Sequence, residues 1–145
     1  MVKAKDFWNY LCMDLDYRFF SGVACPGLSP LYKKMTSKLM HYVPAVNERV
    51  GLGLVSGAYM AGFKGGLLMD MSFAYDLTSF MTFNVSNRIP LLVIGYGNRD
   101  SALTYDFPSV FISGSTFDKQ IKKVAKASEL EKVPGLIVIK EGVLS

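Results

Sequence analysis

The sequence is poor in the residues that build the commonest metal centres and nucleophilic sites. Its 145 residues include one histidine, His41, and two cysteines, Cys12 and Cys25, with no CxxC pair. A histidine-rich metal centre needs several imidazoles, and a Ser-His-Asp or Cys-His site needs a base beside its nucleophile. Two cysteines give no disulfide framework and are typical of a reducing compartment. We therefore expect a cytoplasmic protein with no metal ligands on this chain.

Long apolar runs are also missing. Half of the residues are hydrophobic and the mean hydropathy is +0.25, yet no run reaches the roughly 18 apolar residues that a membrane span needs. The first ten residues contain Lys3, Lys5 and Asp6 and lack the apolar segment of a signal peptide. We expect no membrane association, and we attribute the apolar excess to a buried sheet and a subunit interface.

The positive charge is modest and does not indicate a nucleic-acid partner. The formal net charge is +4, and the densest basic stretch, residues 118–132, carries interleaved acids at helical spacing. It lacks the arginines and interleaved aromatic residues of a nucleic-acid surface. A solvated helix face is the simpler interpretation.

Apolar segments with strand and helix periodicity alternate along the whole chain. Because strands alternate with helices, we predict a three-layer α/β/α fold with a mostly parallel sheet, in one domain spanning residues 1–145. The predicted strands cover residues 18–24, 39–45, 65–71, 89–97, 109–113 and 135–142, and the predicted helices cover 3–13, 27–38, 47–63, 72–87 and 116–132. Ser29 and Ser72 are candidate N-caps, and Pro30 suits the first helical position.

In such sheets, ligands bind outside the carboxyl ends of the strands. Four loops therefore hold the candidate site residues: 23–27, 46–49, 69–76 and 95–100. Cys25, Asp70 and Asp76 in these loops carry little information when taken singly, and an inert buried thiol is the commoner role for Cys25.

The second of these loops ends in Glu48, which opens a helix rich in glycine and alanine. An acid in a first helical turn is commonly an exposed residue that favours the helix dipole. The alternative is a partly buried carboxyl that takes part in proton transfer. Gly51 and Gly53 do not complete a dinucleotide-binding G-x-G-x-x-G pattern. The spacing of Gly53, Gly57 and Ala61 leaves one helix face bare, for packing on the sheet or against another subunit.

Three segments in order, "GVACPGLSPLY", "YVPAVNERVGLGLVSGAYMAGFKGGLLM" and "SNRIPLLVIGYG", resemble the pyrimidine-binding (PYR) domain of thiamine-diphosphate-dependent 2-oxoacid decarboxylases. Within that family the sequence is most similar to the alpha subunit of sulfopyruvate decarboxylase, followed by phosphonopyruvate decarboxylase. The resemblance implies that Glu48 hydrogen-bonds the aminopyrimidine ring of thiamine diphosphate and activates it, with Met71 and Ser72 as further cofactor contacts. It places the substrate against Cys25, Tyr75, Asp76, Tyr96 and Arg99.

The resemblance also implies a partner. In the family, a second domain with a GDG…N motif holds the diphosphate and its Mg²⁺, and no GDG occurs here. We therefore expect a beta-type subunit that carries this motif, in a hetero-oligomer with this chain. Decarboxylation of 3-sulfopyruvate is the first candidate reaction. The alternatives are phosphonopyruvate or another 2-oxoacid, carboligation, or a non-catalytic structural or regulatory subunit, since "MDMSFAYD" departs from the corresponding family loop.

Overall fold

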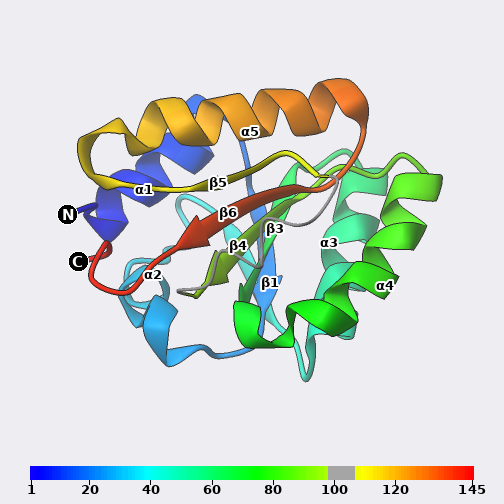
Figure 1. Cartoon of the computed structure of the whole chain (residues 1–145), viewed down its shortest axis with the longest axis horizontal. Coiled ribbons are helices and arrows are strands. Elements are labelled where there is room, and N and C mark those ends of the chain that lie inside the picture. Colours follow the sequence, from blue (N-terminus) through cyan, green and yellow to red (C-terminus); the bar gives the residue numbers. More distant parts are fainter. Residues whose placement is uncertain (98–106) are drawn as a thin grey trace.

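The computed structural model describes the backbone of residues 1–97 and 107–145, and within this part it leaves out the side chains of residues 73–78 and 80. Six strands form one sheet in the order β2-β1-β3-β4-β6-β5, and every neighbouring pair is parallel (Figure 1). The strands are β1 (Phe19–Gly22), β2 (His41–Pro44), β3 (Gly65–Asp70), β4 (Leu92–Tyr96), β5 (Ser109–Phe111) and β6 (Gly135–Ile139). The helices are α1 (Ala4–Asn9), α2 (Ser29–Lys33), α3 (Glu48–Met60), α4 (Ala74–Ser86) and α5 (Phe117–Glu131).

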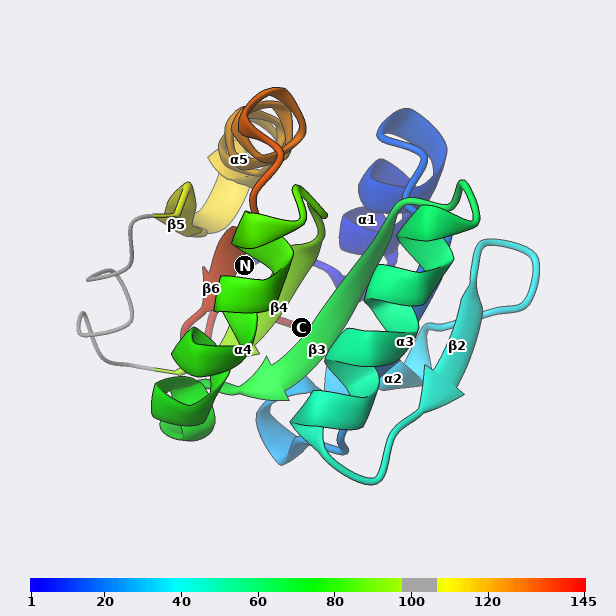
Figure 2. The same ribbon diagram turned by 90° about the vertical axis from the view of Figure 1, so that its right-hand side faces the viewer.

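Helices cover both faces of this sheet. Helices α3 and α4 lie side by side on one face, and α1, α2 and α5 lie on the other (Figures 1 and 2). The two core clusters follow from the two-residue period of the strands. Leu68 and Ile94 point into the α1–α2–α5 side, whereas Leu67 and Val93 point into the α3–α4 side. The predicted three-layer fold is confirmed.

Several element ends differ from the prediction. The first helix continues from α1 as a π-helix over Tyr10–Asp14. Ser29 is not an N-cap, because a 3₁₀ turn over Pro26–Leu28 runs directly into α2 and makes Ser29 the first residue of that helix. Ser72 lies inside a second 3₁₀ turn, Met71–Phe73, that precedes α4. Each turn begins one residue before the predicted helix and takes up its first two residues.

The two chain ends are joined. Val2 forms an isolated parallel bridge with Leu144, in which the Val2 N–H donates to Val143 O at 2.7 Å and the Ser145 N–H donates to Val2 O at 2.9 Å. Figure 1 shows the N and C labels close together beside α1. Among the described helices, none combines the length and apolar character needed to cross a membrane.

Candidate functional site

The strand order itself selects one place on the carboxyl edge of the sheet. From β1 the chain passes through α2 to the edge strand β2, whereas from β3 it passes through α4, on the opposite face, to β4. The loops that leave the adjacent strands β1 and β3 therefore turn toward opposite faces of the sheet. Such a switch point opens a crevice outside the carboxyl ends of the strands, which is where ligands bind in open parallel sheets. All four predicted loops leave the sheet at this edge.

Glu48 lies beside this crevice, at the start of α3. The N-cap of this helix is Asn47, the residue before Glu48. Its Oδ1 accepts the backbone N–H of Val50 at 2.9 Å. The half-buried Glu48 side chain has no hydrogen-bond or ion-pair partner among the residues that the structure describes. Because Asn47 fills the capping role, the Glu48 carboxyl is available for another group.

One turn further, α3 approaches the sheet closely. A β-carbon placed on Gly51 would lie 2.6 Å from Leu67 Cδ1 and 3.5 Å from Ser21 Oγ. The glycine therefore lets the first turn of α3 lie directly against β1 and β3. This contact fixes the height of Glu48 above the carboxyl edge.

Cys25 and Tyr96 meet on the other side of the crevice. A β-carbon on Gly27, two residues after Cys25, would overlap the Tyr96 ring, so the ring lies directly against that backbone. Burial raises the pKa of the Cys25 thiol, and hydrogen bonds from the Gly27 and Leu28 backbone oppose the rise. Cys25 is consequently a neutral thiol near pH 7, suited to hydrogen bonding rather than to nucleophilic attack.

Asp70 belongs to the same cluster. It pairs with Tyr96 in the β3–β4 register, and its Oδ1 accepts the backbone N–H of Ser72 at 2.9 Å. Burial raises the pKa of Tyr96, and the neighbouring Glu141, Cys25 and Asp70 add to the rise. The Tyr96 phenol therefore keeps its proton near neutral pH and can donate it in a hydrogen bond. Asp70 is not in the predicted site set, and its position as the last residue of a buried strand is the signal that could have found it.

Met71 fills the space over the end of β4. A β-carbon on Gly95 would overlap Met71 Sδ, and one on Gly97 would lie 3.0 Å from Met71 Cβ. Met71 packs with the α3–α4 cluster, on the same side of the sheet as Glu48, whereas Tyr96 packs with the opposite cluster. Ser72 follows as an exposed residue. The side chains of Tyr75 and Asp76, and the whole of Arg99, lie outside the described residues.

The described site residues thus fall into two groups at one edge. Cys25, Asp70 and Tyr96 form a cluster of neutral donors and a carboxylate on the α2 side. Glu48 and Met71 lie on the α3 side, and the sheet edge runs between the two groups.

A comparison with known proteins supports the fold. No protein-family model matches the sequence, and no curated relative matches it. Among solved structures, the chain is similar to 2-oxoglutarate:ferredoxin oxidoreductase from Magnetococcus marinus, solved with 2-oxoglutarate, coenzyme A and succinyl-CoA bound. The TM-score is 0.70 at 17% sequence identity. The match covers 98% of this chain and 29% of the length of the other, so the likeness concerns the architecture of one part of a longer protein.

Proposed function

We propose that this chain is the alpha-type, PYR-domain subunit of a heteromeric thiamine-diphosphate-dependent decarboxylase that acts on a 2-oxoacid. The observation that carries the proposal is the uncommitted Glu48 carboxyl, which begins a helix at the switch-point edge while Asn47 does the capping. The structural neighbour is named for a 2-oxoacid, 2-oxoglutarate, and this agrees with the proposed substrate class.

The chemical groups at the carboxyl edge match those that an aminopyrimidine ring needs. Glu48 offers a half-buried carboxyl that can share a proton with a ring nitrogen, and Met71 offers an apolar, adaptable surface on the same side of the sheet. Thiamine diphosphate, when bound, supplies the electron sink that decarboxylation of a 2-oxoacid requires. This chain's part is to hold the ring, to share one proton with it and to keep water away from it.

The substrate would contact the other group. The Cys25 thiol and the Tyr96 phenol are both protonated near neutral pH, so each can donate a hydrogen bond to the carboxylate or oxo oxygen of a 2-oxoacid. The neighbouring Asp70 and Glu141 are acidic, so the cation for a second anionic group must come from elsewhere. Arg99 is the candidate that this chain offers for the sulfonate of 3-sulfopyruvate, the first substrate we propose.

A partner subunit would complete the site by holding the diphosphate and Mg²⁺. The outer face of α3 and α4 suits such a partner, because the sequence has no charged residue between Arg49 and Lys64 or between Asp76 and Arg88. Met60 is 65% exposed and Phe83 is 56% exposed on these helices. Figure 2 shows both helices together on one face of the molecule. We assign this face to the beta-type subunit.

The test is the Glu48→Gln variant in complex with a beta-type subunit that carries the GDG…N motif. Glutamine keeps the shape but cannot share a proton in the same way, and general acid–base contributions are about 10²–10⁴-fold. We expect CO₂ release from 3-sulfopyruvate to fall by at least about 100-fold, with the complex still assembled. Glu131→Gln, an exposed acid at the end of α5, is the matched control and should leave turnover unchanged. Unchanged turnover of Glu48→Gln would refute the proposal.

A further inference from the structure

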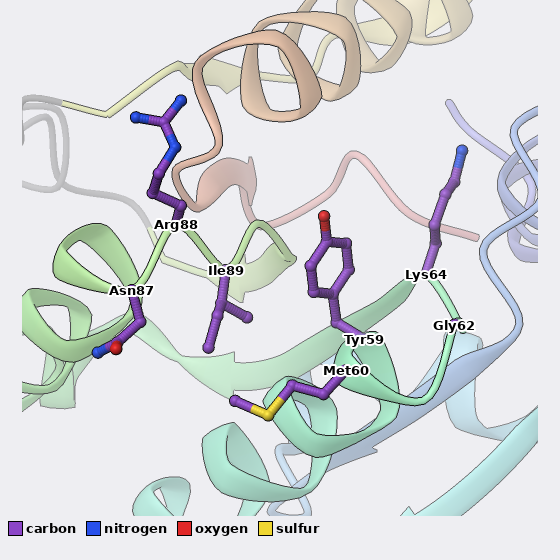
Figure 3. A pocket seen from close by; sticks show the side chains of 7 residues that line it. All are labelled: Tyr59, Met60, Gly62, Lys64, Asn87, Arg88 and Ile89. Atoms are coloured by element: carbon purple, nitrogen blue, oxygen red, sulfur yellow. The ribbon is translucent and has the colours of Figure 1, made fainter.

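A cavity of about 510 Å³ opens at the amino edge of the sheet, at the opposite end from Glu48. It is formed where α3 and α4 end and where the chain enters β3 and β4. Its lining residues are Tyr59, Met60, Gly62, Lys64, Asn87, Arg88 and Ile89, all shown in Figure 3. The volume lies in the range of small-molecule sites, about 300–1,000 Å³. The cavity is separate from the site at the carboxyl edge.

Basic side chains gather around it. Lys64 and Arg88 line the cavity, and Lys132 reaches its tyrosine from the end of α5, with Nζ donating to Tyr59 Oη at 3.2 Å. Among the described residues, the acid paired with these groups is Glu129, whose Oε1 lies 2.7 Å from Lys64 Nζ. In Figure 3 the side chains of Arg88, Tyr59 and Lys64 all extend toward α5, whereas Met60 and Asn87 extend the other way.

Arg88 is the group most available to a ligand. Its φ of 56° places it in the left-handed region, which a residue with a β-carbon adopts at a cost. Among the side chains that the structure describes, its guanidinium has no hydrogen-bond or ion-pair partner. An arginine is always charged and offers a planar set of donors that matches phosphate oxygens.

Tyr59 is a second donor. Because its oxygen accepts the hydrogen bond from Lys132, its own O–H remains available for an acceptor in the cavity. The Tyr59 ring, Met60 and Ile89 add an apolar wall on which an organic group can lie. The cavity therefore combines donors for an anion with a surface for a carbon skeleton.

The common alternative is that these cations simply complement helix ends. Three helices end near this edge, and each end carries about −0.5 charge. Lys64, Lys132, Arg88 and Glu129 together carry a formal charge of +2, so the helix ends offset much of the positive charge but not all of it. The Arg88 backbone N–H donates to Val85 O at the end of α4, but its guanidinium makes no hydrogen bond to a helix-end carbonyl among the described residues, so helix complementation leaves the side-chain donors unused.

We infer that this cavity binds a small organic phosphate monoester, with the phosphate at Arg88 and Tyr59 and the organic part against Met60 and Ile89. This site is separate from the proposed decarboxylase site and does not rest on it. Since the net charge is small and the cavity is open to solvent, the expected Kd is about 0.1–1 mM, and it rises with salt.

The test is calorimetric titration of the chain with adenosine 5′-monophosphate, ribose 5-phosphate and inorganic phosphate at matched ionic strength. Saturable binding of either organic phosphate, at least about fivefold tighter than inorganic phosphate, supports the inference. Binding of the nucleotide alone indicates that the aromatic base lies on Tyr59. Equal affinity for all three probes, or no saturation by any of them, overturns the inference.

Arg88→Gly separates binding from folding. Glycine adopts a φ of 56° without strain, so this variant should melt about 3 °C higher than the natural chain while binding at least tenfold more weakly. Tyr59→Phe keeps the ring, loses the O–H donor and should bind about fivefold more weakly. Lys122→Ala removes an exposed lysine from α5 and is the matched charge control, with affinity unchanged. Full affinity in Arg88→Gly contradicts the assignment.

Discussion

Two glycines on the outer side of α3, Gly53 and Gly57, allow a direct test of why this helix tolerates so many. A β-carbon added at either position meets nothing within 4 Å, so alanine fits without any rearrangement. Glycine in a helix interior costs about 0.5–1 kcal/mol relative to alanine. The double variant Gly53→Ala/Gly57→Ala should therefore raise the free energy of unfolding of this chain by about 1–2 kcal/mol.

Gly51 on the same helix provides the contrast. Its added β-carbon would lie 2.6 Å from Cδ1 of Leu67, which is completely buried. Overpacking a core costs about 1–3 kcal/mol, which exceeds the gain in helix propensity. Gly51→Ala should therefore lower the free energy of unfolding by up to about 2 kcal/mol.

The assay is urea denaturation followed by circular dichroism, together with thermal melting. The double variant should melt about 5 °C higher and Gly51→Ala should melt lower than the natural chain. A double variant that is no more stable than the natural chain would refute the idea that these two glycines are a stability cost in the separate chain. Equal stability of Gly51→Ala and the double variant would refute the role assigned to the close contact with Leu67.

The same double variant tests the proposed partner surface. Its two methyl groups project from the open, uncharged face of α3, where they would hold an approaching helix away. We expect weaker assembly with the beta-type subunit despite higher stability of the separate chain. Undiminished assembly, measured by size-exclusion chromatography with light scattering, would show that the partner does not use this face at close range.

Two further predictions concern the core on the α1–α2–α5 side. Burial raises the pKa of the Cys12 thiol from 9.0 to about 11, so the stability it contributes is complete below pH 9 and is lost as the pH rises through 11. Urea titrations should show a loss of about 1–2 kcal/mol over that interval, part of which disappears in Cys12→Ala; an identical pH profile in that variant would argue against this source. Trp8→Phe removes the 2.8 Å hydrogen bond from Nε1–H to Leu31 O, which then keeps only the bond from the Lys34 N–H at 3.1 Å. The lost hydrogen bond should cost about 0.5–1.5 kcal/mol in the same assay, and no measurable cost would mean that water replaces the indole.

The three-layer fold could be predicted from the sequence, because a strand buried on both faces is a continuous apolar segment. Strands β4 and β6 are continuous apolar segments, and α5 has a clear helical period, so their type and order could be predicted. The 3₁₀ turns around Pro26 and Ser72 could not be predicted in this way, because a short turn and a helix start share the same residue types. Likewise, nothing local shows that Cys25 and Glu48 lie on opposite sides of the sheet, since this depends on the face that each crossover helix covers.

The amino-edge cavity was outside the reach of sequence reasoning for the same reason. Tyr59, Arg88 and Lys132 are far apart in the chain and come together only because three helices end at one edge. None of them belongs to a motif. The left-handed backbone of Arg88 has no signature either, because asparagine or glycine would be the expected residue there.

The bridge between Val2 and Leu144 gives the fold one more property. The hydroxyl of Ser145 lies within hydrogen-bonding distance of Val2 O across 143 positions, so the path through all six strands returns to its starting point. A unit whose entrance and exit coincide can be spliced into a surface loop of a larger polypeptide without stretching either. The same architecture can thus occur within a much longer chain, as it does in the oxidoreductase, where it accounts for 29% of the length.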